Sequence, residues 1–228
     1  MKVELIDYTE WGINKIATLA RSTRLNRFDE SEPEEFFDLI PQNNGNFEMK
    51  VTKEYKEWEK KNANFIKNLI KVKHLGVLEH INFTFHVSEI SRCLTHQLVR
   101  HRIGFSYLQM SNRHSKPERI DFVRPESINQ NGLAKEWFYN TMYEAYENYE
   151  KIIEKGIPIE DARYLLPPAY FTHISFTCNA RSLRHFLKLR LDPNAQWEIR
   201  ELACKLFDEV YKIYPLLFED LKELRKGK

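Results

Sequence analysis

Residues 80–113 read HINFTFHVSEISRCLTHQLVRHRIGFSYLQMSNR, and the period of the apolar side chains changes within this one stretch. The first part alternates apolar with polar residues, which predicts a strand with one buried face. Its apolar members are Ile81, Phe83, Phe85 and Val87. From Ile90 to His101 the spacing becomes helical, with polar groups at the end of an otherwise apolar stripe. A polar loop then continues to about Lys116, so the stretch predicts a strand, a helix and a loop in succession.

The rest of the chain predicts further helices and two further strands. The strands cover residues 3–8 and 169–177. Helical spacing occurs in residues 10–19, 52–75, 133–153, 182–190 and 195–211. Residues 24–46 are polar, contain Pro33, Pro41 and Gly45, and are predicted to form a loop around a short apolar patch. Because helices and strands do not alternate as βαβ units, we expect a single α+β domain over residues 1–228, with long helices and a mixed or antiparallel sheet.

Composition excludes several classes of protein. The chain has 228 residues, of which 42% are hydrophobic, enough for one substantial core. Its 35 basic and 33 acidic side chains give a net charge of +2, so no global field favours nucleic acid or membrane. The first residues are acidic and polar, and no run of about 18 apolar residues occurs. We therefore expect a soluble cytoplasmic protein with no membrane or nucleic-acid partner.

Cysteines and histidines give no sign of a metal site. Cys93, Cys178 and Cys204 form no CxxC pair, which argues against zinc and against a disulfide framework. The histidines are spread over separate predicted elements, so no metal cluster is encoded locally. Cys178 is the least implausible thiol nucleophile, but we interpret it as structural. The chain also has no GxGxxG or Walker loop, so a dinucleotide would have to bind outside a Rossmann framework.

Arginines are dense in residues 100–113. Within fourteen positions this segment holds three arginines and several neutral hydrogen-bonding groups, namely Arg100, Arg102 and Arg113 with His101, Ser106, Gln109 and Ser111. Guanidinium groups match phosphate bidentately, and hydroxyls or loop amides can complete an anion site. The spacing is equally compatible with a solvated basic turn, so both interpretations remain open at this point.

A second basic segment, NARSLRHFLKLR at residues 179–190, places Arg190 on an apolar stripe. The stripe consists of Leu183, Phe186 and Leu187 with Arg190. An interior guanidinium requires an anion or several acceptors. Alternatively, Arg190 lies at a helix C-terminus, where the macrodipole favours a cation and the side chain reaches solvent. Arg181, Arg184 and Lys188 lie on another face, which we expect to be solvated.

The triplet Arg100–His101–Arg102 followed by Ser111 resembles the signature of the flavin-dependent thymidylate synthases. The similarity extends, in family order, through LEHINFTFHV at residues 78–87, QLVRHR at residues 97–102, RYLLPP at residues 163–168 and NARSLRHFLKLRLDPNAQWEIR at residues 179–200. These blocks span most of the predicted core. The resemblance implies the thymidylate synthase-complementing protein fold.

The resemblance also implies roles for individual residues. FAD would be bound by Gly76, Arg100, His101, Arg102, Gln109, Asn179, Ala180, Arg181 and His185. The nucleotide dUMP would be bound by Gln97, Leu98, Val99, Arg100, Gln109, Met110, Ser111, Asn112, Arg113, Arg163 and Arg190. Arg190 would be the catalytic residue, because a cation against the pyrimidine favours ionisation at N3 and makes C5 more nucleophilic. Ser111 would bind substrate rather than act as a nucleophile.

The implied reaction is reductive methylation of dUMP to dTMP. Methylenetetrahydrofolate would donate the carbon, and FAD reduced by NADPH would donate the hydride, so the cofactors perform the difficult chemistry while the protein positions them. The family members are homotetramers whose active sites combine several subunits. The predicted clusters therefore need not meet within one chain.

Several positions depart from the family pattern. Eight residues separate Arg102 from Ser111, so the register inside this loop can shift by one. Gln109 and His114 replace residues that are commonly acidic and tyrosine, while His185 and Asn194 replace a common asparagine and histidine. These departures motivate one alternative, a flavoprotein of this fold that has changed or lost the reaction. The other alternative is an RNA-binding protein that uses the arginine clusters, against which the near-neutral charge and the lack of an RNP or KH motif count.

Overall fold

A four-stranded antiparallel sheet forms the centre of the computed structural model, which describes residues 1–23, 37–41, 47–113 and 121–227. Its strands lie in the order β1-β4-β6-β5, with β1 at Lys2–Tyr8, β4 at Asn82–Ser91, β6 at Phe171–Asn179 and β5 at Phe105–Gln109. Phe85 pairs with Phe176 across β4 and β6, and β5 pairs with β6 from Phe105 opposite Cys178 to Gln109 opposite Ile174. These pairings confirm the predicted α+β class and the antiparallel form of the sheet.

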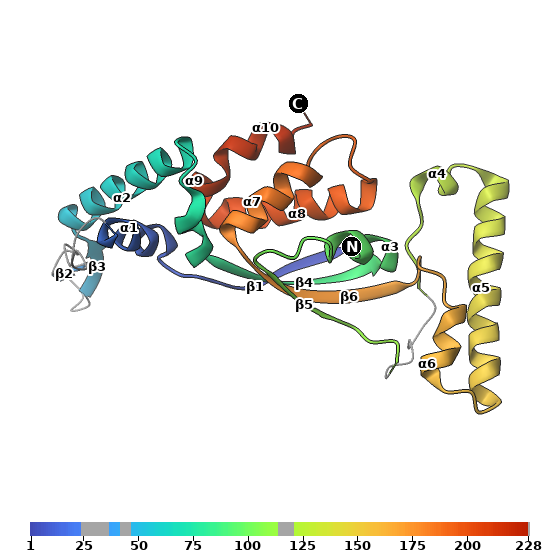
Figure 1. Ribbon diagram of the computed structural model, residues 1–228. Coiled ribbons are helices and arrows are strands. Elements are labelled where there is room, and N and C mark those ends of the chain that lie inside the picture. The colour runs from blue at the N-terminus through green and yellow to red at the C-terminus, as the bar shows by residue number, and fades with distance from the viewer. Residues whose placement is uncertain (24–36, 42–46, 114–120, 228) are drawn as a thin grey trace.

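Helices from the C-terminal third cover one face of the sheet (Figure 1). They are α7 (Ala180–Arg190), α8 (Trp197–Ile213), α9 (Pro215–Phe218), η3 (Glu219–Leu221) and α10 (Lys222–Arg225). The apolar stripe of α7 is completely buried at Leu183, Phe186 and Leu187. It packs in one cluster with the inward side chains of the sheet, including Phe83 and Phe176. The opposite face of the sheet is polar, with hydroxyl and imidazole pairs between β4 and β6.

The ends of the sheet carry separate groups of elements (Figure 1). At one end lie α1 (Gly12–Ser22), the hairpin of β2 (Phe37–Pro41) and β3 (Phe47–Val51), α2 (Lys53–Lys71) and η1 (Leu75–His80). At the other end lie α4 (Glu126–Asn129), the long α5 (Gly132–Glu154), α6 (Ile159–Ala162) and η2 (Arg163–Leu165). A second buried cluster joins α5 to α6 and to the start of β6; its members are Phe122, Met142, Tyr146, Tyr149, Ala162 and Tyr170. Within the described ranges, every helix is too short or too polar to span a bilayer.

Four local predictions were wrong. The helix expected from Ile90 to His101 is shorter, α3 at Arg92–Leu98, because Ile90 and Ser91 continue β4 and pair with β6. The polar loop predicted after it contains β5, and the loop predicted for residues 24–46 contains β2. Arg184 is not solvated but 8% exposed, since its guanidinium binds the carboxylate of Asp220 and the carbonyl oxygen of Leu217.

Candidate active site

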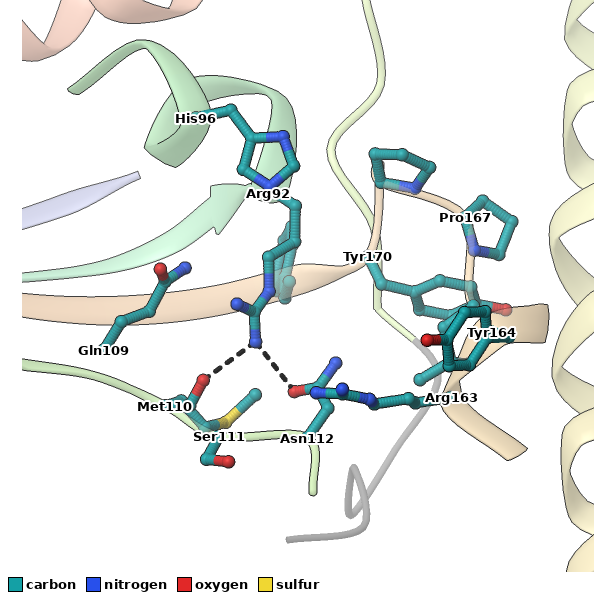
Figure 2. A pocket seen from close by; sticks show the side chains of 13 residues that line it. Arg92, His96, Gln109, Met110, Ser111, Asn112, Arg163, Tyr164, Pro167 and Tyr170 are labelled. Atoms are coloured by element: carbon teal, nitrogen blue, oxygen red, sulfur yellow. Dashed lines mark hydrogen bonds between the residues drawn. The ribbon is translucent and has the colours of Figure 1, made fainter. Parts of the chain in front are cut away.

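A cavity of about 540 Å³ lies between α3, the end of β5 and the segment that leads from η2 into β6. This volume is within the range of small-ligand sites. Figure 2 shows side chains from these elements pointing into it. The lining consists of Arg92, His96, Gln109, Met110, Ser111, Asn112, Arg163, Tyr164, Leu166, Pro167, Pro168, Tyr170 and Phe171. Among the described residues, the lining therefore contains two arginines and no carboxylate.

The start of α3 fixes the backbone of Arg92. Ser91 is the N-cap, and its hydroxyl accepts a hydrogen bond from the Leu94 N–H. Glu198 of α8, which is 2% exposed, accepts the Ser91 N–H at 2.8 Å and the Ser91 hydroxyl at 2.5 Å. The Arg92 N–H donates to the carbonyl oxygen of Pro168 at 2.8 Å. The first turn of α3 is thus attached to α8 and to the wall of the cavity.

The guanidinium of Arg92 connects α3 to the segment that follows β5 (Figure 2). Its Nη2 donates to the Met110 carbonyl oxygen at 2.8 Å and to the Asn112 side-chain oxygen at 3.0 Å. Arg163 approaches from the opposite wall, where its Nε donates to the Glu160 carbonyl oxygen. Burial and the nearby charge of Arg163 lower the pKa of Arg92. Two cations that repel each other, with no carboxylate beside them in the described part of the lining, favour an anionic ligand.

Gln109 at the end of β5 and Met110 directly after it both line the cavity. The Gln109 amide donates to the hydroxyl of Thr95 at 2.9 Å and to that of Thr172 at 3.5 Å. Ser111 is exposed in the cavity wall. Arg113 lies farther out and forms a surface ion pair with Glu160 at 3.2 Å. His114 lies outside the described residues.

A second cluster of predicted residues surrounds His101, at the other end of β5. The Arg190 Nε, at the end of α7, donates to His101 Nε2 at 3.2 Å. The His101 ring packs edge-on against Phe186 at 4.9 Å. Burial, Arg190 and His185 together lower the pKa of His101 to about 4. His101 is therefore neutral at physiological pH, and its unprotonated Nε2 accepts the hydrogen bond that orients Arg190.

Two close contacts hold the turn that carries Arg100, His101 and Arg102. The Tyr107 hydroxyl lies within hydrogen-bonding distance of the carbonyl oxygens of Leu98 and His101. Gly104 has φ +68, and a Cβ there would collide with the side chains of Asn179 and Ser182. A side chain at this position would push the turn away from α7, so Gly104 is required here. Sequence reasoning missed Gly104.

The same turn faces the N-terminus of α7. Asn179 caps this helix by accepting the Ser182 N–H, and Arg181 forms an ion pair with Glu79 at 2.6 Å. Arg100 and Arg102 are exposed, and among the described residues their guanidinium groups have no hydrogen-bond partner. The cluster thus offers several N–H donors and positive charge beside a helix N-terminus, an arrangement that suits the diphosphate of a dinucleotide.

The structure separates the predicted site residues into these two clusters. Gln109, Met110, Ser111, Asn112 and Arg163 meet around the cavity. The second cluster contains the turn after α3, the start of α7 and Arg190. Because Phe105 and Gln109 are the two ends of β5, the clusters are roughly 13 Å apart along this strand. The lining of the cavity includes no residue of the second cluster.

Some predicted residues have side chains that face the core. Leu98 and Ala180 are completely buried, and Val99 packs against the same core, so only their backbone atoms can reach a ligand. Gly76 lies exposed in η1, with open space around its Cα. Arg92 and His96 line the cavity but were not singled out from the sequence, although their position just before QLVRHR was a usable signal.

Metal and thiol chemistry find little support in this geometry. Among the described residues, no group of three or more His, Cys, Asp or Glu side chains could hold a metal ion. Cys178 is buried, and burial raises the pKa of its thiol, so it is a poor nucleophile.

Comparisons with known proteins agree with the motif blocks. The sequence pattern of the thymidylate synthase complementing protein matches residues 4–216. A protein of Sulfurisphaera tokodaii is 39% identical over 220 residues, which is 96% of this chain and 76% of the relative. A protein of Clostridium tetani is 39% identical over 177 residues, 71% of each chain, and one of Pyrococcus horikoshii is 47% identical over 144 residues, 61% of this chain and 58% of the relative. All three are named flavin-dependent thymidylate synthase. The chain therefore belongs to the thymidylate synthase complementing protein family, that of the flavin-dependent thymidylate synthases.

Proposed function

We propose that this chain converts dUMP to dTMP as a flavin-dependent thymidylate synthase, with residues 1–228 acting as one domain. Methylenetetrahydrofolate would supply the carbon and FAD reduced by NADPH the hydride. The observation that carries the proposal is the cavity that Arg92 and Arg163 both line, with no carboxylate among its described lining residues. A nucleoside monophosphate is an anion that such a lining can bind.

We assign dUMP binding to residues of both clusters. At the cavity, the Ser111 hydroxyl, the Asn112 amide and the Arg163 guanidinium supply donors for phosphate and sugar oxygens. Gln109, Met110 and Arg113 complete this part, while Gln97, Leu98, Val99, Arg100 and Arg190 contribute from the turn after α3 and from α7.

FAD would bind at the second cluster, whose donor set fits an anionic dinucleotide. Arg100, Arg102, Arg181 and the capped start of α7 supply positive charge and N–H groups. His101, His185, Gly76, Asn179 and Ala180 lie in the same region, and Gln109 is the one member of the proposed FAD set that lies at the cavity. When bound, the flavin supplies hydride transfer, which no side chain can perform.

Arg190 would act on the uracil ring. Its Nε is held by neutral His101, so the remaining N–H groups of the guanidinium keep a fixed direction. Pointed at the pyrimidine, these donors stabilise negative charge on the ring after N3 ionises, which raises the electron density at C5. Because His101 is uncharged at neutral pH, it accepts the hydrogen bond from the Arg190 guanidinium without repelling its positive charge.

A complete site would then need two copies of the chain. The cavity and the Arg190 cluster lie at opposite ends of β5, and no residue of the Arg190 cluster lines the cavity. We propose a homotetramer in which the cavity of one copy faces the Arg190 cluster of another. Sedimentation of the purified protein would test this, since a monomer with full activity contradicts it.

The first experiment is the visible absorption spectrum of the purified protein with NADPH, recorded with and without dUMP. A bound flavin that bleaches with NADPH, followed by formation of dTMP once folate is added, supports the proposal. Tight flavin binding without dTMP would instead favour the flavoprotein with a changed reaction, which the Gln109 departure motivates. Failure to bind added FAD, together with salt-dependent RNA binding, would replace the proposal by nucleic-acid binding.

A further inference from the structure

The backbone of Arg92 is attached to two neighbouring segments of the fold. Its own N–H is bonded to Pro168, and the preceding Ser91 is bonded twice to the buried Glu198. A side chain on such a well-anchored backbone can hold another segment in place, because little conformational entropy of its own backbone is lost when the contact forms.

The partners of Arg92 flank Ser111. Met110 makes the last backbone bond with β6, from its N–H to the His173 carbonyl oxygen at 3.1 Å. Beyond Met110 the chain leaves the sheet, so side chains rather than strand pairing must hold it. The Nη2 of Arg92 binds the residues on either side of Ser111, at the Met110 carbonyl and the Asn112 side chain.

We propose that Arg92 is a positioning residue that fixes residues 110–112 and thereby directs the Ser111 hydroxyl into the cavity. This inference rests on the proposed function only for the identity of the ligand, dUMP. The link itself is a property of the chain without ligand. Hydrogen bonds from a charged donor are stronger than neutral ones, which makes the two bonds sufficient to hold a short segment.

A different role for Arg92 would be direct contact with the ligand. The two roles predict different combined effects on dUMP binding when Arg92 and Asn112 are both substituted. If Arg92 acts through the segment, removing Asn112 already breaks one of its two bonds, and the effects of the two substitutions are not additive. If Arg92 instead binds the ligand independently of Asn112, the two effects add.

The ligand-free test is hydrogen exchange of the backbone amides in the peptide covering residues 107–113. Arg92→Gln should exchange about tenfold faster than the wild type within residues 111–113, at the Arg113 N–H that donates to the Ser111 hydroxyl, since the charged donor that holds this segment is lost. Arg225→Gln is the matched control, because Arg225 also loses two side-chain hydrogen bonds, to Asp208 on α8, and neither residue lines the cavity. Should Arg92→Gln not fold, Asn112→Ala breaks the link from the other side and should show the same faster exchange.

The ligand test is calorimetric titration of dUMP. Arg92→Gln should bind dUMP about tenfold or more weakly, Arg92→Lys should recover part of this loss, and the Arg92→Gln/Asn112→Ala pair should be non-additive. Unchanged exchange at residues 111–113, or additive effects on dUMP binding, overturns the inference. Faster exchange in a protein whose wild type binds no dUMP would leave the positioning role in place and remove the proposed function.

Discussion

Glu198→Gln tests whether a buried carboxylate holds the start of α3. Glu198 is 2% exposed, and its two oxygens accept the N–H and the hydroxyl of Ser91 at 2.8 and 2.5 Å. A glutamine keeps one oxygen but turns an NH₂ group toward one of these two donors. If this donor is the Ser91 hydroxyl, its second lone pair can accept from the NH₂ group, but its own hydrogen then loses its acceptor; if it is the Ser91 N–H, two donors face each other.

This mismatch of donors should lower the free energy of unfolding. One hydrogen bond to a charged acceptor is lost and a buried donor is left without a partner, for which we expect about 2 kcal/mol. In a chain of this size such a loss lowers the melting temperature by about 4–8 °C. Thermal unfolding by circular dichroism at fixed chain concentration measures the shift directly.

The matched control is Glu201→Gln on the same helix. The Glu201 side chain is 43% exposed and forms an ion pair with Lys205 at 3.5 Å, so its loss should cost only about 0.3 kcal/mol. Equal melting temperatures for the two variants would refute the reasoning, because the buried bonds to Ser91 would then contribute no more than a surface ion pair.

Three further predictions concern the site. Arg190→Ala should lower the rate of dTMP formation by at least about a hundredfold, with an unchanged far-ultraviolet spectrum. Lys188 is exposed on the same helix, and the Lys188→Ala control should keep the wild-type rate. An active Arg190→Ala variant would remove Arg190 from its proposed role. The pKa of His101 is lowered from 6.5 to about 4 in the folded chain, so the unfolded chain binds this proton first as the pH falls. The contribution of neutral His101 to the free energy of unfolding is therefore complete above about pH 6.5 and is lost toward pH 4. Urea midpoints should therefore fall less between pH 7 and pH 5 for His101→Asn than for the wild type, and equal falls would contradict the shift. Gln109→Glu should cost about 1 kcal/mol in urea unfolding, because a carboxylate cannot donate to Thr95; a variant as stable as the wild type would show that the Thr95 hydroxyl reorients without loss.

The central strands and long helices could be predicted because their periodicity matches their burial. The alternation from Ile81 to Val87 became β4, and the predicted helix at residues 133–153 became α5. The helix expected from Ile90 failed because pairing of Ile90 with Thr172 extends β4, a contact between segments about eighty residues apart that periodicity cannot reveal. β5 was missed because it is an edge strand of only five residues whose apolar and polar residue types do not alternate; Leu108 is apolar but 79% exposed.

The residue types of the site could be predicted from its motifs, but their arrangement could not. The structure brings His101 of the RHR triplet and Arg190 together through a hydrogen bond. Helical spacing did not reveal that Arg184 is buried, because its partner Asp220 follows only after α8 and α9. Arg92 was overlooked for a related reason, since Met110, Asn112 and Arg163 reach it only through the folding of β5 and η2.

The position of the two clusters at opposite ends of β5 also has a genetic consequence. If each site takes one cluster from each of two copies, a chain damaged at Arg190 and a chain damaged at Arg163 carry complementary lesions. Expressed together in a cell that depends on this enzyme for thymine, the two defective alleles would form mixed oligomers in which about one site in four is intact. Growth without added thymidine would then return, although neither allele alone supports it.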